Sequence, residues 1–371
     1  MEVTLVRHAQ TSANAAGVLQ GQGQGSLTSL GEEQAEALSD RIDVSDYDVL
    51  LVSDLDRALA TADALGEGFV ALQTWRELNL GDWEGMTRSE VREGYAEELE
   101  RMRSGEDIHF GGGESWEEFS NRVRSGFDDL SDGMEEGQRG LVVTHGGVIN
   151  EVLRLVGGLP ERSGRFGRSA NTGITRLVRE HGAWSLAVFN DATHLHSDPP
   201  YLRERIERGR QAAFLIRHGE TDATDGRGEG ESDQGLNAVG RSQADVLSDR
   251  VDAPVVFSSP MESAWETAYA LNGSDPVRLA ELTEMRKGTE GETWKEVGTR
   301  MNEGIEAALS STDEARVAFV SHGPAIRAYL SRILHLPQRK RNRLAPVENA
   351  SVSSLVFEER GPVIASFNVT F

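Results

Sequence analysis

The chain of 371 residues contains no cysteine, which excludes disulfide bonds, thiolate metal ligands and cysteine nucleophiles. Lysine is scarce too: apart from Lys287, Lys295 and Lys340, every basic side chain is arginine. No apolar run is long enough to cross a bilayer. The opening MEVTLV is typical of a first strand rather than of a secretion signal. We therefore expect a cytoplasmic protein that has no membrane partner.

Positive charge is outnumbered, with 61 acidic against 38 basic residues and a formal net charge of -23. Such an excess repels nucleic acid over most of the surface, so we expect no nucleic-acid partner. The basic run QRKRNR at 338–343 is interpreted as a solvated face. The acid excess and the scarce lysine suggest a halophilic protein that works in molar salt, although an ordinary acidic surface explains the same composition.

The sequence also repeats itself, with matching segments in the same order. SLTSLGEEQAEALSDRI (26–42) returns as QGLNAVGRSQADVLSDRV (234–251), and LVVTHGGVI (141–149) returns as AFVSHGPAI (318–326). Between the two copies lies a stretch with a Pro-Pro pair followed by alternating charge, which indicates a linker with a short solvated helix. The repeat predicts the following domains: 1–198, a linker at 199–211, and a second, shortened domain at 212–371.

Each copy alternates apolar runs of strand length with helical patterns, such as Ala35, Leu38 and Ile42. The strands are almost continuously apolar, which is typical of parallel strands buried on both faces. We predict an α/β fold: two tandem α/β/α sandwich domains, each with a mostly parallel central sheet. Each copy ends in a predicted hairpin, one turning at His181-Gly182 and the other at Gly361-Pro362.

The first copy carries a segment that the second lacks, residues 86–113, here called the lid segment. Thr87 and Glu90 match a capping box at a helix start. One face of that helix would be apolar, formed by Val91, Tyr95, Leu99 and Met102. This helix is a candidate lid over a pocket, and an ordinary surface helix fits the pattern equally well.

Polar side chains suited to phosphate chemistry follow the predicted strands of the first copy. Arg7 and His8 follow the first strand, Arg57 follows LLVSD, and His145 follows LVVT. The carboxyl ends of parallel strands meet at one edge of a sheet. Arginine binds phosphate with two donors, and a neutral imidazole is a nucleophile. A leaving oxygen also needs a proton, for which Glu77 is the best candidate.

Four motifs occur in order: RHxxT with Asn14 downstream, SDLDRAxxTA, REL followed by GDWEG, and THGG. Together they resemble the histidine phosphatase superfamily, also called phosphoglycerate mutase-like, and the resemblance extends over both copies. One departure is Ala9, where the family has glycine; a small residue still allows close backbone packing.

The resemblance implies that His8 is the nucleophile and becomes phosphorylated, and that Glu77 is the acid. It also implies that Arg7, Arg57 and His145 hold the phosphoryl oxygens, with Asn14 at the pocket edge. Gln20, at the start of the glycine-rich stretch, is expected to contact phosphate. No metal and no cofactor are implied. A metal site built from Asp191, His194 and His196 is disfavoured by its awkward spacing.

The second copy keeps Arg217, His218, Glu284 and His322 as candidate site residues, but Ser263 stands where the first copy has Arg57. Losing a charged donor costs roughly 1.5–3 kcal/mol of phosphate binding. Arg286 and Lys287, close to Glu284, are candidate replacements. We expect this copy to be weakly active or idle, with its motifs retained for anion binding, dimerisation or packing.

From these residues we predict metal-independent hydrolysis of a phosphomonoester, with a small phosphorylated metabolite as the substrate. The short acidic lid segment resembles the phosphatase branch rather than dedicated mutases. Phosphoglycerate mutase-type transfer is the runner-up, and a phosphate-binding module without turnover is the third hypothesis. The sequence gives no oligomeric state.

Overall fold

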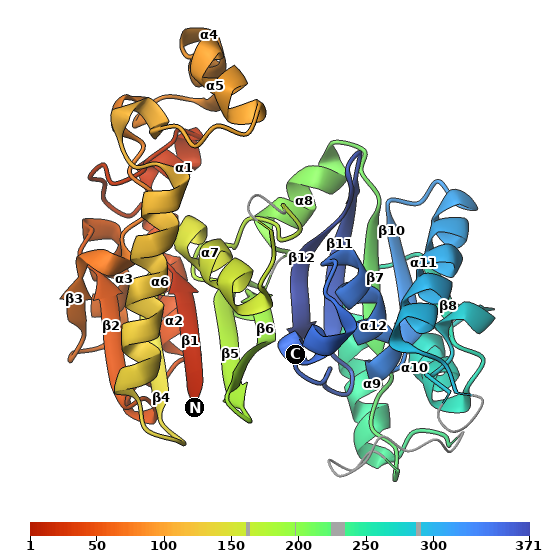
Figure 1. The fold of residues 1–371 in the computed structure, drawn as a ribbon. Coiled ribbons are helices and arrows are strands. Elements are labelled where there is room, and N and C mark those ends of the chain that lie inside the picture. The colour runs from red at the N-terminus through yellow and green to blue at the C-terminus, as the bar shows by residue number, and fades with distance from the viewer. Residues whose placement is uncertain (161–163, 197, 224–233, 287–290) are drawn as a thin grey trace. The chain divides into compact units, whose positions relative to one another are not determined.

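A computed structural model describes residues 1–160, 164–196, 198–223, 234–286 and 291–371 (Figure 1). The chain forms two compact units. Unit 1 comprises Met1–Val156, Ser169–Trp184 and His194–Ser197. Unit 2 comprises Gly157–Arg168, Ser185–Thr193 and Asp198–Phe371.

The sheet of unit 1 has the strand order β3-β2-β4-β1-β5. Strands β1 to β4 pair in parallel, and β5 is antiparallel to β1. Their bounds are β1 (Glu2–Arg7), β2 (Val49–Ser53), β3 (Val70–Leu72), β4 (Arg139–Thr144) and β5 (Ile174–Glu180). The central β1 and β4 are buried because their apolar side chains alternate between two faces that are both covered by helices.

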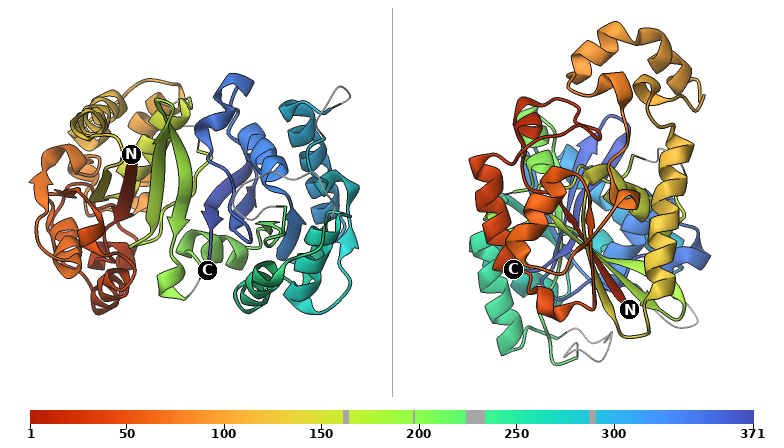
Figure 2. Two further views of the ribbon diagram at one scale, coloured as in Figure 1. Left: turned by 90° about the horizontal axis from the view of Figure 1, so that it is seen from below. Right: turned by 90° about the vertical axis from the view of Figure 1, so that its left-hand side faces the viewer.

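Helices cover both faces of this sheet. The right-hand view of Figure 2 shows α2 and α3 on one face and α6 on the other. The helices of unit 1 are α1 (Ser12–Ala16), α2 (Ser29–Ser39), α3 (Asp56–Leu65), α4 (Arg88–Gly94), α5 (Ala96–Arg103), α6 (Trp116–Gly133) and α7 (Gly146–Gly157). As the period predicted, Ala35, Leu38 and Ile42 are buried, and Leu38 and Ile42 pack in a core with Val52 and Leu141.

Unit 2 repeats this plan with the strand order β6-β12-β11-β7-β10-β8-β9. Strands β7, β10, β8 and β9 are parallel, and β11 and β12 are antiparallel additions. Their bounds are β6 (Ala183–Asp191), β7 (Ala212–Arg217), β8 (Val255–Ser258), β9 (Val277–Arg278), β10 (Arg316–Ser321), β11 (Val352–Glu358) and β12 (Gly361–Val369). The predicted α/β fold with a mostly parallel sheet is confirmed.

The helices of unit 2 again lie on two faces, α9 with α10 and α11 with α12 (Figure 2). They are α8 (Pro200–Glu207), α9 (Ala238–Arg250), α10 (Glu262–Asn272), α11 (Trp294–Ser310) and α12 (Gly323–Ile333). Within the described ranges, none of the helices is long and apolar enough to cross a membrane. The predicted linker helix is α8, and it is not fully solvated, because Tyr201 and Leu202 are buried in the core of unit 2.

The compact units do not follow the two sequence copies residue by residue. Residues 157–168 and 185–193 belong to the first copy by sequence and to unit 2 by packing. Phe189 of β6 pairs with Phe367 of β12, and the Phe189 ring contacts Phe166. The predicted boundaries 1–198, 199–211 and 212–371 come from the sequence repeat. The compact units are instead built from segments that alternate along the chain between residues 157 and 198.

The predicted hairpins are present. β5 turns into β6 through His181 and Gly182, which have φ values of 50° and 77°, and β11 pairs with β12 through Gly361. The lid segment differs from the single predicted helix, because the helix breaks at Tyr95 (φ -127°, ψ 38°) into α4 and α5. The capping box at Thr87 is formed. Val91, Tyr95, Leu99 and Met102 share one apolar cluster with Trp83.

Candidate active site

His8 lies where the chain leaves β1 at the carboxyl edge of the sheet, and it is only 3% exposed. Its backbone N–H donates to the Thr144 carbonyl of β4 at 2.8 Å, which ties it to the neighbouring strand. The ring Nδ1 lies 2.7 Å from the Ala9 carbonyl oxygen. A carbonyl can only accept, so the ring hydrogen is on Nδ1. The lone pair is therefore on Nε2.

Arg57, in the first turn of α3, is buried against this histidine. Its Nε–H donates to His8 Nε2 at 3.2 Å. Its two Nη groups donate to the carbonyls of Gly23 (2.9 Å) and Gly21 (2.6 Å). Burial lowers the pKa of Arg57 to about 10, a shift that nearby carboxylates, first among them Glu77, oppose. The guanidinium is thus charged at neutral pH.

His145 follows β4 and is fully buried. Its ring centroid is 5.1 Å from that of His8, and its Nε2 lies 2.8 Å from Ser53 Oγ at the end of β2. Ser53 Oγ also accepts from the Leu55 N–H at 3.4 Å, so its own hydrogen is available for His145 Nε2. Among the described residues, His145 Nδ1 has no hydrogen-bond partner. This arrangement favours the tautomer with a donor on Nδ1.

Both histidines are neutral in this environment. Burial lowers the pKa of His8 well below its ordinary value, and the charges of Arg7 and Arg57 lower it further. Burial also lowers the pKa of His145, with Arg57 as the next cause. A neutral imidazole with its lone pair on Nε2 is the form that can attack an electrophile.

Glu77 is held by backbone donors on both carboxylate oxygens. The Gly147 N–H, in the first turn of α7, donates to Oε2 at 3.0 Å, and the Leu78 N–H donates to Oε1 at 2.9 Å. The main chain beside it is fixed from α6, because Arg122 donates to the carbonyls of Arg76 (2.8 Å) and Glu77 (3.2 Å). Arg122 in turn is paired with Glu114 at 2.7 Å.

The other predicted residues lie around this centre. Arg7 donates to the Ser169 carbonyl at 2.6 Å. Asn14 Oδ1 accepts from Asn171 Nδ2 at 3.0 Å, and the same Nδ2 donates to the His8 carbonyl at 2.9 Å. Gln20 Oε1 accepts from Thr11 Oγ1 at 2.8 Å.

The structure thus joins His8, Arg57 and His145 by direct ring and side-chain contacts. It links Glu77 to Arg57 by charge, and Asn14 to His8 through Asn171. Sequence reasoning placed the glycine-rich stretch 21–26 at the pocket edge but did not foresee that the Gly21 and Gly23 carbonyls hold Arg57, and it missed Ser53, Thr61 and Asn171. Most of them approach from distant parts of the chain and carry no spacing signal.

Unit 2 builds a related arrangement. His218 Nδ1 lies 2.7 Å from the Gly219 carbonyl, and its ring centroid is 5.1 Å from that of His322. His322 Nε2 lies 2.9 Å from Ser259 Oγ. Burial lowers the pKa of His218 to about 4. Glu284 Oε2 is 4.0 Å from His322 Nδ1.

Two differences in unit 2 fall on donors of the unit 1 arrangement, namely the partner of His8 and the partner of Glu77. Ser263 is buried at the Arg57 position, and Pro324, which has no N–H, stands where Gly147 donates to Glu77. Arg286, a candidate replacement, is exposed and lies 3.6 Å from Glu292. The other candidate, Lys287, lies outside the described residues.

In the part of the chain that the structure describes, no three His, Asp or Glu side chains are grouped so as to hold a metal ion. The disfavoured metal candidates have other contacts. His194 Nε2 lies 2.9 Å from Thr172 Oγ1, and Asp191 Oδ1 accepts from the Thr193 hydroxyl at 2.7 Å.

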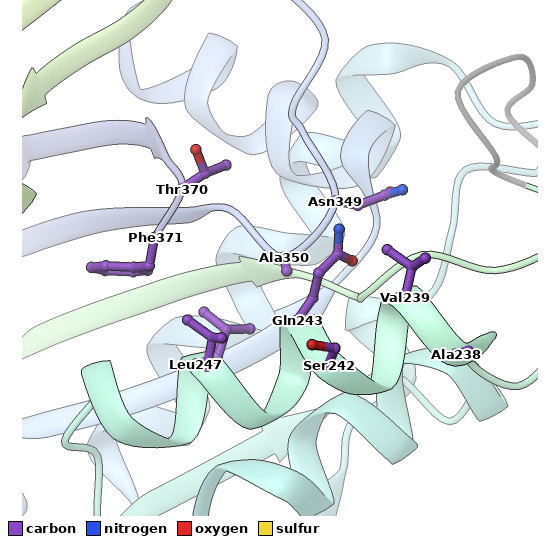
Figure 3. A pocket seen from close by; sticks show the side chains of 10 residues that line it. Ala238, Val239, Ser242, Gln243, Leu247, Asn349, Ala350, Thr370 and Phe371 are labelled. Atoms are coloured by element: carbon purple, nitrogen blue, oxygen red, sulfur yellow. The ribbon is translucent and has the colours of Figure 1, made fainter. Parts of the chain in front are cut away.

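A surface pocket of about 450 Å³ opens elsewhere, between α9 and the last residues of the chain (Figure 3). Its lining is mainly apolar and includes Val239, Leu247, Ala350 and Phe371. The lining contains none of the histidines of unit 2, so this hollow is separate from the candidate site.

A family model described as "Histidine phosphatase superfamily (branch 1)" matches residues 3–192, and it matches the second copy over residues 213–289 and 278–370. The chain belongs to the histidine phosphatase superfamily. Its tandem organisation agrees with this repeated match, and the resemblance inferred from the motifs is confirmed.

Among curated relatives in this superfamily, "Probable phosphoglycerate mutase GpmB" of Enterobacter sp. (strain 638) is 32% identical over 216 residues, which is 55% of this chain and 98% of the relative. The protein of the same name from Salmonella choleraesuis (strain SC-B67) is 30% identical over the same shares.

Solved structures of similar sequence include the α-ribazole phosphatase of Shigella flexneri, with 28% identity and a TM-score of 0.47 over 52% of this chain and 96% of that chain. A phosphoserine phosphatase of Entamoeba histolytica has 27% identity and a TM-score of 0.48 over 52% and 98%.

Proposed function

We propose that unit 1 hydrolyses phosphomonoesters without a metal ion, through a phosphohistidine formed on His8. The observation that carries this proposal is the charged donor at the His8 lone pair: Arg57 Nε–H points at His8 Nε2 at 3.2 Å, while the Ala9 carbonyl fixes the ring hydrogen on Nδ1 and burial lowers the pKa of His8. Arg57 and His145 stand beside that lone pair as donors suited to phosphoryl oxygens.

In the first step His8 Nε2 attacks phosphorus and forms a P–N bond as the ester P–O bond breaks. Glu77, in its protonated form, gives its proton to the leaving oxygen. In the second step Glu77 takes a proton from water, whose oxygen attacks phosphorus and breaks the P–N bond. Inorganic phosphate leaves and His8 returns to its starting form. Arg7, Arg57 and the Nδ1–H of His145 stabilise the charge on the phosphoryl oxygens in both steps.

Phosphoglycerate mutase-type transfer is the second candidate, because the curated relatives are named as probable phosphoglycerate mutases. The lid segment favours hydrolysis. It is short, and its acidic residues outnumber its arginines even though Glu100 pairs with Arg103 at 3.2 Å, so its net negative charge disfavours a substrate with two anionic groups. We therefore place a small phosphomonoester of low overall charge in unit 1, with Asn14 and Gln20 at the pocket edge.

The test is hydrolysis of 4-nitrophenyl phosphate by the wild type, His8→Ala and His218→Ala, with EDTA present and in molar KCl because of the charge of -23. His181→Asn, at an exposed hairpin turn, is the matched control. We expect turnover to vanish only in His8→Ala. Turnover lost in His218→Ala instead would move the activity to unit 2. Turnover absent in every protein would favour a mutase or a binding module.

A further inference from the structure

The orientation of the Arg57 guanidinium is set by the glycine-rich loop at 21–23 as well as by helix α3. Its Nη groups donate to the carbonyls of Gly21 and Gly23, which leaves its Nε–H facing His8 Nε2. A phosphoryl group that arrives at His8 must take over this Nε–H, because the lone pair that it blocks is the attacking one. The two loop carbonyls keep the guanidinium in place during that exchange.

The loop is held by its neighbours, because the Gln22 side chain donates to the Glu77 carbonyl and the carboxylate of Glu84 accepts from the backbone of the loop. Glu84 Oε1 accepts from the backbone N–H of Gln22 at 2.7 Å and from that of Leu80 at 3.2 Å. A Cβ atom added at Gly21 would lie only 2.2 Å from Glu84 Oε1, and φ at Gly21 is +53°, so glycine is required for this close approach.

The segments that carry these groups are also paired through their backbones. Gly85 N–H donates to the Leu19 carbonyl at 2.7 Å, and Leu19 N–H donates to the Met86 carbonyl at 2.8 Å. Glu84 therefore sits at a junction between the glycine-rich loop and the start of the lid segment. Its negative charge also favours the charged form of the buried Arg57.

We propose that Glu84 is a positioning residue for phosphoryl transfer in unit 1: it fixes the loop whose carbonyls hold Arg57 against His8. The chain of contacts runs from the Glu84 carboxylate through the Gln22 amide and the Gly21 and Gly23 carbonyls to the guanidinium. This inference rests on the proposed function, since it assigns Glu84 a part in the same reaction.

The test compares Glu84→Ala and Glu84→Gln with the exposed control Glu136→Gln. A misplacement of about 1 Å in a catalytic group costs about 100-fold in rate, so we expect Glu84→Ala to lower kcat/KM by about that factor. The loss should fall mainly on kcat, and inhibition by orthovanadate, which imitates the transferring phosphoryl group, should weaken in parallel. Glu84→Gln keeps an oxygen for the Gln22 amide and should recover most of the activity.

Thermal unfolding separates positioning from folding. An unchanged Tm with lower kcat and weaker orthovanadate inhibition in Glu84→Ala supports the proposal. Wild-type kcat/KM in Glu84→Ala, or equal loss in the Gln and Ala variants together with a lower Tm, overturns it. A different result would contradict the proposed function itself: phosphatase activity that survives in His8→Ala.

Discussion

The sites of the two units share their histidine pair, their acidic residue and much of their supporting structure, and they differ in the donors around these groups. In both, a backbone carbonyl fixes the ring of the first histidine. A threonine hydroxyl accepts the N–H of the residue after that histidine: Thr61 of α3 accepts from Ala9 at 2.9 Å, and Thr267 of α10 accepts from Gly219 at 3.0 Å. An arginine–glutamate pair holds the carbonyl of the acidic residue in each, through Arg122 in unit 1 and Arg300 in unit 2.

Besides the missing lid segment, two differences in unit 2 fall on donors of the site. Ser263 replaces the buried cation Arg57, and Pro324 replaces the N–H of Gly147. The histidine pair of unit 2 is nevertheless present, and both rings are buried. We therefore expect turnover to depend on the donors around the histidines as well as on the histidines themselves.

Among these predictions, the largest loss of activity should come from placing in unit 1 the serine that unit 2 has at the Arg57 position. Arg57→Ser removes the charged donor beside His8 Nε2, and removal of such a preorganised donor costs about 100- to 1000-fold in rate. Steady-state kinetics with 4-nitrophenyl phosphate will measure this, with Arg41→Ser on the exposed surface as control. A loss under tenfold would mean that the Arg57–Ser263 difference does not separate the units.

Low pH should reduce the stability of both units, because both contain buried histidines that are neutral in the folded protein. Because burial lowers the pKa of His218 to about 4, the unfolded chain takes up a proton first as pH falls below 6.5. The stability contributed by neutral His218 is complete above pH 6.5 and is lost between pH 6.5 and about 4.

At pH 5 this loss amounts to about 2 kcal/mol relative to pH 7.5. Denaturant unfolding of the wild type and His218→Gln at both pH values will test it, since the variant should lose that much less. The matched variant His8→Gln should respond similarly, because the pKa of His8 is also lowered. Equal acid sensitivity of the wild type and His218→Gln would show that His218 titrates normally.

The smallest loss of kcat should come from removing the backbone N–H of Gly147 that donates to Glu77. Gly147→Pro removes the N–H bound to Glu77 Oε2, and losing a charge-assisted hydrogen bond costs about 1.5 kcal/mol, so kcat should fall roughly tenfold below that of Gly147→Ala, which carries the same Cβ. The helix should tolerate the change, because unit 2 carries Pro324 in the same turn of α12.

Gly147→Ala is the matched variant for this test. It keeps the N–H, but its Cβ would lie 2.1 Å from Glu77 Oε1, so it measures displacement of the carboxylate alone. Gly147→Pro should be the slower of the two. If both variants have equal kcat, the N–H itself is unimportant and the Pro324 difference does not bear on turnover.

The part of the candidate site that could be predicted from the sequence consists of residues that directly follow a strand. His8 and His145 lie at the ends of β1 and β4, and the pairing of these strands brings them together. The alternation of elements also predicted the parallel sheet. The difference at Pro324 was visible as THGG against SHGP, but its meaning depends on the Glu77–Gly147 hydrogen bond.

Other parts of the site had no signal in the sequence. Asn171 reaches His8 and Asn14 across more than 150 positions of chain, and Gly21 acts through its carbonyl, which every residue possesses. The lid segment was predicted as one helix because its apolar spacing is continuous, yet the backbone turns at Tyr95. Periodicity reports which side chains share a face and does not report where the axis bends.

The placement of β6 in unit 2 has a consequence for anyone who divides the gene at the repeat. Asn190 donates to the Ala365 carbonyl and Asn368 donates to the Ala187 carbonyl, both at 2.8 Å, so β6 and β12 are joined by side chains as well as by pairing. A fragment starting at residue 199 would expose β12 as an open, apolar edge prone to aggregation. A fragment of the second copy should therefore begin no later than the start of β6, at residue 183, to keep this edge covered.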